Sequence, residues 1–424
     1  MLDKRRIAVV SPFLDKRHGT ERCVAEQVER LAWEYGYEVH VYSQSVEDVA
    51  GVYTSRAWLE EPGNGPERSG KPRGQGGTGR IIWHKVPAVP GPGLIKYLWW
   101  YAANHLWRWW DATVRGARYD LLYSPGINCL DADAISVHIV FAEFHERVKP
   151  DLALRRNPPM VWPRILHRRL YYRLIMALER RVYPRKHLVL AAVSQKTAQE
   201  LGRFYGRDGD VSVIYHGVDL ERFSPRVRER LRSQARRELR LPEEAFSLLL
   251  IGNDWKNKGL PCLLDAVGQL QDPRLWVLVA GRDDRTPFEA RVRSCGLAGQ
   301  VRFLPLRPDV EFYYAAADAY VGPSLEDAFA LPPAEAMACG LPVIVSNQAG
   351  VCEIITDGVD GLVLKDPRDA RELAGLIRRV LQDVGLRQRL GERAVQSARR
   401  YTWGRNAAET AAFLEKAMSQ RDQP

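Results

Sequence analysis

Short apolar runs alternate with amphipathic stretches along almost the whole chain, and this alternation restricts it to an α/β fold with parallel sheets. The first half contains the runs IAVVSP, EVHVYS, IIWHKV, DLLYSP, AISVHIV and LVLAAVS. The second half contains FSLLLIGN, LWVLVAG, VRFLP, AYVGPS, PVIVSN and GLVL. Helices are predicted over residues 21–33, 260–270 and 333–339, and from about 369 to the end.

A turn-rich connector at residues 208–228 separates two strand–helix series. We therefore predict an N-terminal domain over 1–212 and a C-terminal domain over 213–400. A final helix over 401–424 is predicted to pack back on the first domain. Residues 61–80 are dense in Gly and Pro and indicate a mobile loop. Since ligands bind at the carboxyl ends of parallel strands, both domains can direct loops into a cleft between them.

Composition narrows the classes of partner. Hydrophobic residues are 46% and charged residues 27%, which excludes a disordered or fibrous chain. The net charge of +10 favours an anionic partner, such as nucleic acid, acidic lipid or a phosphorylated substrate. Six scattered cysteines form no CxxC pair, and no apolar stretch is long enough to span a membrane. We therefore expect a cytoplasmic protein, which can contact a membrane only at the inner face of that membrane.

The densest chemical signal is the stretch from Pro323 to Val343. A strand ends at Pro323, a loop of small residues follows, and a short helix with proline in its first turn ends at Gly340. Asp327 and Glu335 stand eight residues apart, and small neighbours leave the backbone N–H groups of the loop approachable. Such an element suits an anionic, polyhydroxyl ligand. Alternatively, Glu335 only stabilises the first turn of its helix.

This stretch resembles the E-x7-E signature of the family-4 retaining glycosyltransferases. The other resembling segments, in the same order as in the family, are His18-Gly19-Thr20-Glu21, YGYEVHVYS, VSVIYHGVDLERFSP, Ile251-Gly252 through Lys258-Gly259, and Gly350 through Ile355. The resemblance implies the GT-B fold, in which two Rossmann-like domains face each other across a cleft, and a nucleotide-sugar donor. It implies no cofactor and no metal.

Two positions depart from the family pattern. The first acid of the signature is Asp327 where the family usually has Glu, although Glu326 precedes it. Asn253 stands where the family often has Arg, and Lys256 can supply the missing charge.

The resemblance implies a role for each candidate residue. Glu335 would hold the ribose, Lys258 the diphosphate, and Asp327 the donor sugar. His138 would act in the donor pocket from the end of a first-domain strand, so the implied catalytic set is His138, Lys258 and Asp327. The implied donor-binding set is Gly19, Asn253, Lys256, Lys258, Asp327, Ala328, Phe329, Ala330, Leu331 and Glu335.

Plain alternatives remain for three of these residues. Lys258 can be a solvated loop lysine, and Gly19 an ordinary turn glycine. His138 can be a core histidine of an apolar strand whose hydrogen bonds are satisfied within the protein.

Other motifs are dismissed. Asp131-Ala132-Asp133 imitates a metal-binding DxD motif, but nothing places it at a nucleotide site. Residues 252–259 lack the G-K-[ST] ending of a P-loop, and no G-x-G-x-x-G follows a strand, so a nicotinamide cofactor is not expected.

Tryptophan, tyrosine and arginine crowd into residues 97–110 and 162–181. This composition suits a bilayer interface or an anionic lipid-linked acceptor. Alternatively, the aromatic rings belong to the core and the arginine side chains lie on a solvent-exposed face. Nucleic acid is not expected, because no recognition module accompanies the basic residues.

The resemblance therefore implies a retaining hexosyltransferase. The expected donor is a nucleoside diphosphate sugar, with a UDP-sugar favoured and a GDP-sugar as second choice. The expected acceptor is a hydroxyl of a glycan or lipid-linked molecule in cell-surface polysaccharide or lipopolysaccharide synthesis. The alternatives are a phosphorylase or synthase of the same fold, and a binding subunit without turnover.

Overall fold

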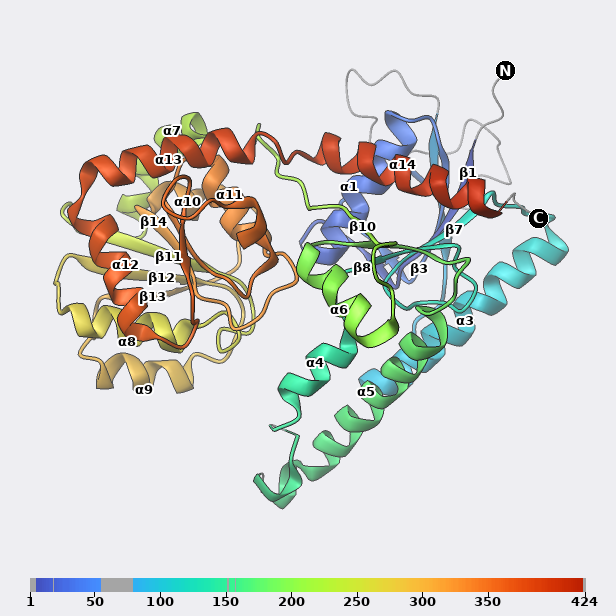
Figure 1. The fold of residues 1–424 in the computed structure, drawn as a ribbon, viewed down its shortest axis with the longest axis horizontal. Coiled ribbons are helices and arrows are strands. Elements are labelled where there is room, and N and C mark those ends of the chain that lie inside the picture. Colours follow the sequence, from blue (N-terminus) through green and yellow to red (C-terminus); the bar gives the residue numbers. More distant parts are fainter. Residues whose placement is uncertain (1–4, 18, 55–78, 151, 157, 422–424) are drawn as a thin grey trace. The chain divides into compact units, whose positions relative to one another are not determined.

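The computed structural model describes residues 5–17, 19–54, 79–150, 152–156 and 158–421. It divides into two compact units, residues 1–215 with 406–424 and residues 216–405 (Figure 1). The sequence placed these limits after residues 212 and 400. Of the predicted mobile loop, residues 61–78 lie outside the described part of the chain, and Arg80 already begins a strand.

Unit 1 is built on a sheet of eight parallel strands in the order β10-β9-β8-β7-β1-β3-β6-β5. The strands are β1 (Arg6–Val10), β3 (Glu38–Ser43), β5 (Val52–Thr54), β6 (Arg80–Lys85), β7 (Leu121–Pro125), β8 (Ala134–Val137), β9 (Val189–Ala192) and β10 (Ser212–Val213). A two-stranded ribbon pairs β2 (Phe13–Leu14) with β4 (Ser45–Val46). The central strands are buried on both faces, as expected for a parallel sheet that is covered by helices on both sides.

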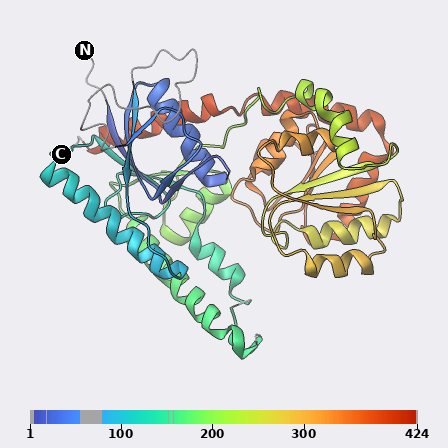
Figure 2. The ribbon, with the colours of Figure 1, turned by 180° about the vertical axis from the view of Figure 1, so that it is seen from behind.

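Helices cover both faces of this sheet. On one face lie α1 (Gly19–Trp33) and the part of α14 (Trp403–Arg421) that follows Asn406. On the other lie α3 (Gly93–Val114) and α5 (Trp162–Val182), which run side by side in Figures 1 and 2. The shorter elements are α4 (Phe141–Val148), α6 (Gln195–Tyr205) and the 3-10 turns η1 (Leu154–Arg156) and η2 (Pro159–Val161).

Unit 2 is built on six parallel strands in the order β13-β12-β11-β14-β15-β16. The strands are β11 (Phe246–Ile251), β12 (Leu275–Ala280), β13 (Val301–Leu304), β14 (Ala319–Gly322), β15 (Val343–Ser346) and β16 (Leu362–Leu364). The helices are α7 (Pro225–Glu238), α8 (Leu260–Leu270), α9 (Thr286–Ser294), α10 (Glu311–Ala316), α11 (Leu331–Ala338), η3 (Gly350–Ile354), α12 (Ala370–Gln382) and α13 (Val384–Ala398). Counted within the unit, the order is 3-2-1-4-5-6, that of a doubly wound dinucleotide-binding sheet.

The predicted α/β alternation is confirmed, with small differences at element ends. The strand EVHVYS and the helix at 260–270 have the predicted bounds. The helix predicted at 333–339 begins earlier, at Leu331, because prolines are tolerated in a first turn, where their missing N–H would have no helical partner. Within the described residues, we find no helix with the length and apolarity needed to cross a bilayer.

Candidate active site

In unit 2 the strand order reverses between β11 and β14, and the loops that follow these two neighbouring strands carry most of the candidate residues. Residues 252–259 lead from β11 into α8, and residues 323–330 lead from β14 into α11. At such a switch point the two crossover helices lie on opposite faces of the sheet, so their loops diverge and leave a crevice for a ligand.

Lys258 reaches from the first loop to the second and forms an ion pair with Asp327. Its path crosses Gly252, where an added Cβ would lie 2.7 Å from the lysine Cε. Gly252 has a φ of 146°, a conformation that favours glycine. Glycine here therefore gives the lysine its route to Asp327. The side chains of the pair are 20% and 17% exposed, so both can meet a ligand.

Asn257 ties the same two loops together. Its side-chain amide donates to the carbonyl of Glu326 at 2.8 Å, and its own carbonyl accepts from the N–H of Leu325 at 2.7 Å. Next to it, a Cβ on Gly259 would lie only 1.9 Å from the carbonyl oxygen of Pro323. The loops are thus held in contact by backbone packing as well as by charge.

The second loop is also joined to the segment after β15. The N–H of Gly350 donates to the carbonyl of Asp327 at 3.0 Å, and the N–H of Val351 donates to that of Phe329 at 2.7 Å. The N–H groups of Ala328 and Ala330 have no acceptor within the described part of the chain. Fixed amides of this kind, near a lysine, suit the oxygens of an anionic ligand.

Ala330 has a φ of 71° immediately before α11. A non-glycine residue in this region costs about 1–3 kcal/mol, and such strain is concentrated at functional sites. Beside it, Leu331 is buried as the first residue of α11, and Phe329 is buried against the ring of His216 at 5.0 Å between centroids. Two of the predicted donor-binding residues, Phe329 and Leu331, thus have side chains in the core, which leaves their backbone for a ligand.

Glu335 is 4% exposed and accepts a 2.6 Å hydrogen bond from the hydroxyl of Tyr314 on α10. The interpretation that Glu335 stabilises a first helical turn is wrong, because α11 begins at Leu331 and has no acidic residue in its first turn. Burial, and then the charge of Glu335, raise the pKa of Tyr314 well above its usual value. The phenol therefore stays protonated and holds the carboxylate in one orientation.

The remaining phosphate-loop candidates, Asn253 and Lys256, are exposed. The Asn253 side-chain oxygen accepts from the N–H of Arg282 at 2.9 Å, which links the loop to the one after β12. Asn253 therefore orders the loop where the family often has a cation.

Unit 1 holds the other two candidates. Gly19 is exposed as the first residue of α1. His138 directly follows β8 and so lies at the carboxyl end of that strand, as the family resemblance implied, although the run AISVHIV predicted a longer strand. Burial lowers the pKa of His138 to about 4, and its imidazole is therefore neutral near pH 7.

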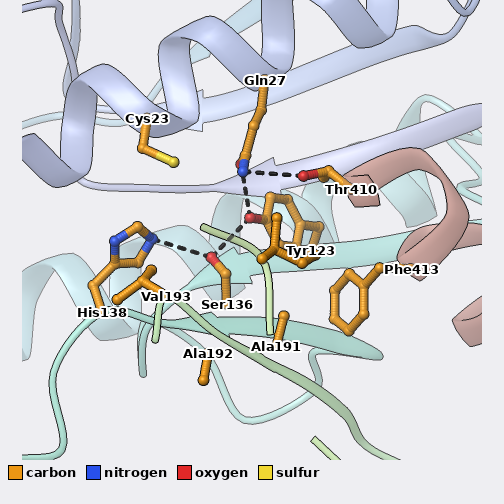
Figure 3. Close-up of a pocket in the computed structure, with 11 residues that line it drawn as sticks. Cys23, Gln27, Tyr123, Ser136, His138, Ala191, Ala192, Val193, Thr410 and Phe413 are labelled. Atoms are coloured by element: carbon orange, nitrogen blue, oxygen red, sulfur yellow. Dashed lines mark hydrogen bonds between the residues drawn. The ribbon is translucent and has the colours of Figure 1, made fainter. Parts of the chain in front are cut away.

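A hydrogen-bond chain connects His138 to the last helix, as Figure 3 shows. The imidazole Nε2 lies 3.3 Å from the hydroxyl oxygen of Ser136, and that oxygen accepts a 2.7 Å hydrogen bond from the hydroxyl of Tyr123. Tyr123 also lies 3.0 Å from Gln27 on α1, whose amide donates to Thr410 on α14 at 3.1 Å. These groups line a cavity of about 10 Å³, room for about one water molecule.

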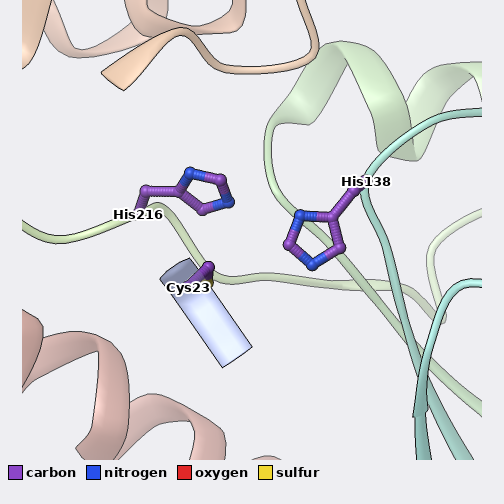
Figure 4. A group of neighbouring side chains, drawn as sticks. All are labelled: Cys23, His138 and His216. Carbon is purple, nitrogen blue, oxygen red and sulfur yellow. The ribbon is translucent and has the colours of Figure 1, made fainter. Parts of the chain in front are cut away.

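Cys23 lies one helical turn after Gly19 and also lines this cavity. Burial raises the pKa of its thiol, so it is protonated and not a reactive thiolate. Figure 4 draws the side chains of Cys23 and His138, which come from α1 and from the end of β8.

The dismissed DxD look-alike is used structurally. Asp131 accepts two hydrogen bonds, of 2.7 and 2.8 Å, from the guanidinium of Arg108 on α3. Asp133 accepts from the N–H of Leu122 at 2.8 Å.

Sequence reasoning missed Asn257 and Tyr314. Asn257 directly precedes the identified Lys258, and this adjacency is the signal that could have found it. Tyr314 gives no such signal, because it is a buried tyrosine 21 residues before Glu335.

Two family models match the chain. The model described as "Glycosyltransferase Family 4" matches residues 17–222, and that described as "Glycosyl transferases group 1" matches residues 232–397. A D-inositol 3-phosphate glycosyltransferase of Streptomyces bingchenggensis is 36% identical over 247 residues, which is 54% of this chain and 53% of that protein. The chain thus aligns with about half the length of the curated relatives it matches.

Solved structures match over almost the whole chain. WaaG, a glycosyltransferase involved in lipopolysaccharide biosynthesis, has a TM-score of 0.73 at 20% identity and covers 96% of this chain and 98% of its own. Anabaena HepE in complex with UDP-glucose has a TM-score of 0.66 at 19% identity and covers 97% and 99%. The chain has two doubly wound parallel sheets, and the two family models together match both of its halves. It therefore belongs to the family-4 glycosyltransferases of the GT-B fold.

Proposed function

We propose that this protein is a retaining glycosyltransferase that moves a hexose from a nucleoside diphosphate sugar to a hydroxyl group. The observation that carries the proposal is the ion pair of Lys258 with Asp327 at the switch point of unit 2, in the loop that leads into the helix of the buried Glu335. A cation, fixed amides and carboxylates match the phosphates and hydroxyls of such a donor.

In this proposal each group has one task. Glu335, oriented by Tyr314, accepts hydrogen bonds from the ribose hydroxyls. Lys258 and the amides of Ala328 and Ala330 bind diphosphate and sugar oxygens, and Asp327 accepts from a sugar hydroxyl. Asn257 takes part indirectly, because it positions the loop that carries Lys258.

UDP-glucose is the first donor to test, and GDP-sugars are the second. The choice is supported by Anabaena HepE, which has this fold and has been solved with UDP-glucose. We propose that the donor binds without a protein-bound metal, because Lys258 supplies the positive charge at the loop. Donor binding measured by calorimetry should persist in EDTA, and loss of both binding and turnover in EDTA would contradict this point.

We propose transfer with retention and without a covalent sugar–enzyme intermediate. The bond between the anomeric carbon and the diphosphate oxygen breaks, and the acceptor oxygen bonds to the same face. The acceptor proton passes to the departing phosphate oxygen, while Lys258 and the loop amides stabilise the developing negative charge. The carboxylates are already engaged, Asp327 by Lys258 and Glu335 by Tyr314, which supports a mechanism without a carboxylate nucleophile.

The acceptor is proposed to be a glycan or a lipid-linked molecule of the cell surface. A phosphorylated cyclitol is a second candidate, because curated relatives are named D-inositol 3-phosphate glycosyltransferases. Release of UDP from UDP-glucose should rise on adding one of these acceptors, and NMR of the product's anomeric proton should show the donor's configuration. An inverted product would exclude the mechanism, and binding without any transfer or donor hydrolysis would favour a non-catalytic subunit.

A further inference from the structure

Helices α3 and α5 form one layer over a face of the unit 1 sheet, and they contact each other along their sides. The rings of Tyr97 and Tyr171 meet edge to face at 5.6 Å, and the N–H of Leu94 donates to His167 at 3.1 Å. Figures 1 and 2 show the pair side by side from two opposite directions. Their outer faces therefore belong to the same side of unit 1.

The outer face of α3 is apolar along its whole length. Trp100, Ala103 and Asp111 turn toward the sheet and are at most 3% exposed. The opposite side carries an apolar stripe, whose members are 38–57% exposed: Ile95, Leu98, Trp99, Leu106, Trp109 and Trp110. Helical spacing of these positions places them on one face of the helix.

The outer face of α5 combines apolar and cationic side chains. Trp162, Leu166 and Leu170 follow one another at intervals of four residues and are 39–55% exposed. Arg164 and Arg173 of the same helix are also exposed, and within the described part of the chain neither forms an ion pair.

The two helices expose no carboxylate. Each contains a single acidic residue, and both are buried. Asp111 pairs with Arg115 at 2.8 Å, and Glu179 accepts from the hydroxyl of Tyr205 at 2.6 Å. The outer surface is therefore apolar and positively charged, with no acidic group of its own to neutralise it.

We propose that the outer faces of α3 and α5 dock this protein on an anionic lipid bilayer. Tryptophan is the side chain that prefers the level of the headgroups, and leucine enters the acyl boundary just below it. Arginine is attracted to the phosphates of acidic lipids. Neither helix crosses the bilayer, so both lie along its surface.

A second copy of the chain is a poorer occupant of this surface. A twofold contact made through the same face would bring the arginines of α5 close to those of the partner, and no exposed carboxylate on either helix would offset the repulsion. The bilayer offers both the apolar medium and the negative charge. The inference goes beyond the proposed chemistry, because docking is measured without donor or acceptor.

Flotation of the full chain with vesicles tests the proposal. We expect binding to phosphatidylcholine vesicles that contain phosphatidylglycerol, much weaker binding to phosphatidylcholine alone, and a decrease with added salt. The double variant Arg164→Gln/Arg173→Gln should lower the partition coefficient by roughly five-fold for each arginine. Trp109→Ser/Trp110→Ser should lower it by about ten-fold or more.

Matched controls come from unit 2. Leu306→Ser/Val384→Ser removes equally exposed apolar side chains, and Arg226→Gln/Arg230→Gln removes exposed arginines of α7; both should bind like the unchanged protein. All the substituted residues are exposed, and unchanged melting temperatures would show that the variants fold.

No flotation with either kind of vesicle would overturn the proposal. Equal losses of binding in the test and control variants would also overturn it. Concentration-dependent dimerisation abolished by Trp109→Ser/Trp110→Ser, without vesicle binding, would instead assign the face to a second copy.

Discussion

The hydroxyl of Tyr314 lies 2.6 Å from a carboxylate oxygen of Glu335, and both side chains are buried in unit 2. The ring of Tyr314 packs edge to face on Phe223 at 5.6 Å. Glu335 is thus a buried acceptor held by a rigid donor, and this preparation suits the recognition of ribose hydroxyls.

Replacing Glu335 with alanine should weaken UDP binding at least ten-fold. Charge-assisted hydrogen bonds contribute roughly 1.5–3 kcal/mol each, and the alanine variant loses them. The protein should remain folded, because the Tyr314 hydroxyl also lies 3.2 Å from the carbonyl oxygen of Pro332, a second acceptor. Calorimetry with UDP measures the effect. Tyr314→Phe should show a smaller loss and exposed Glu229→Ala none; normal UDP binding by Glu335→Ala would remove Glu335 from the site.

Replacing Asp327 with asparagine should have opposite effects on UDP affinity and on turnover. In the unliganded protein Lys258 is paired with Asp327, so a diphosphate must compete with this carboxylate. Even solvent-exposed ion pairs contribute up to about 1 kcal/mol, so UDP should bind about five-fold more tightly in the variant. Turnover should fall, because the contact with the donor sugar is lost.

Glu326→Gln is the matched control for that experiment, since it removes the neighbouring carboxylate that the sequence left as an alternative. Glu326→Gln should change neither the affinity for UDP nor the turnover. If Glu326→Gln impaired turnover and Asp327→Asn did not, the first acid of the signature would have to be reassigned.

His138→Ala should lower kcat more than it weakens donor binding, as expected for a group that acts chiefly where charge develops. With its pKa lowered to about 4 by burial, His138 should not titrate between about pH 5 and 8. Removing it should therefore change the height of the pH–rate profile and not its shape. Ser136→Ala, which removes the 3.3 Å contact with the imidazole, should have a smaller effect. A variant with unchanged kcat would support a core role instead.

Glu179 should make the folded state less stable as pH rises. Burial raises its pKa from 4.5 to about 7, so between these values the folded protein keeps a proton that the unfolded chain has lost. The free energy of unfolding should therefore fall by about 3 kcal/mol across this window and level off above it. Glu179→Gln should remove this dependence, because its amide can bond to Phe141 N–H and the Tyr205 hydroxyl, the partners of the acid.

Denaturant unfolding of both proteins at about pH 5 and about pH 8 measures this difference. Exposed Glu229→Gln serves as the control and should follow the original protein. Equal pH dependence in Glu179→Gln and the original protein would show that Glu179 is ionised in the fold.

The sequence by itself determined the elements and the positions of most candidate residues. Strand and helix are encoded locally, by apolar periodicity, proline and glycine, so β3 and α8 have the predicted bounds. The spacing of Asp327 and Glu335 is equally local, because one loop and one short helix carry both. The start of α11 was misplaced because its prolines also fit a first turn, which moves Glu335 into the second.

Only the tertiary structure decided which distant groups meet. Lys258 and Asp327 are 69 residues apart and pair because β11 and β14 are neighbours where the strand order reverses. The link between Tyr314 and Glu335 depends in the same way on how α10 packs. Trp99 and Trp100 are neighbouring residues of the same type, yet Trp99 is 38% exposed and Trp100 only 2%. Which ring faces water depends on how α3 is rotated against the sheet, and that rotation is set by packing across the whole unit rather than by any local pattern.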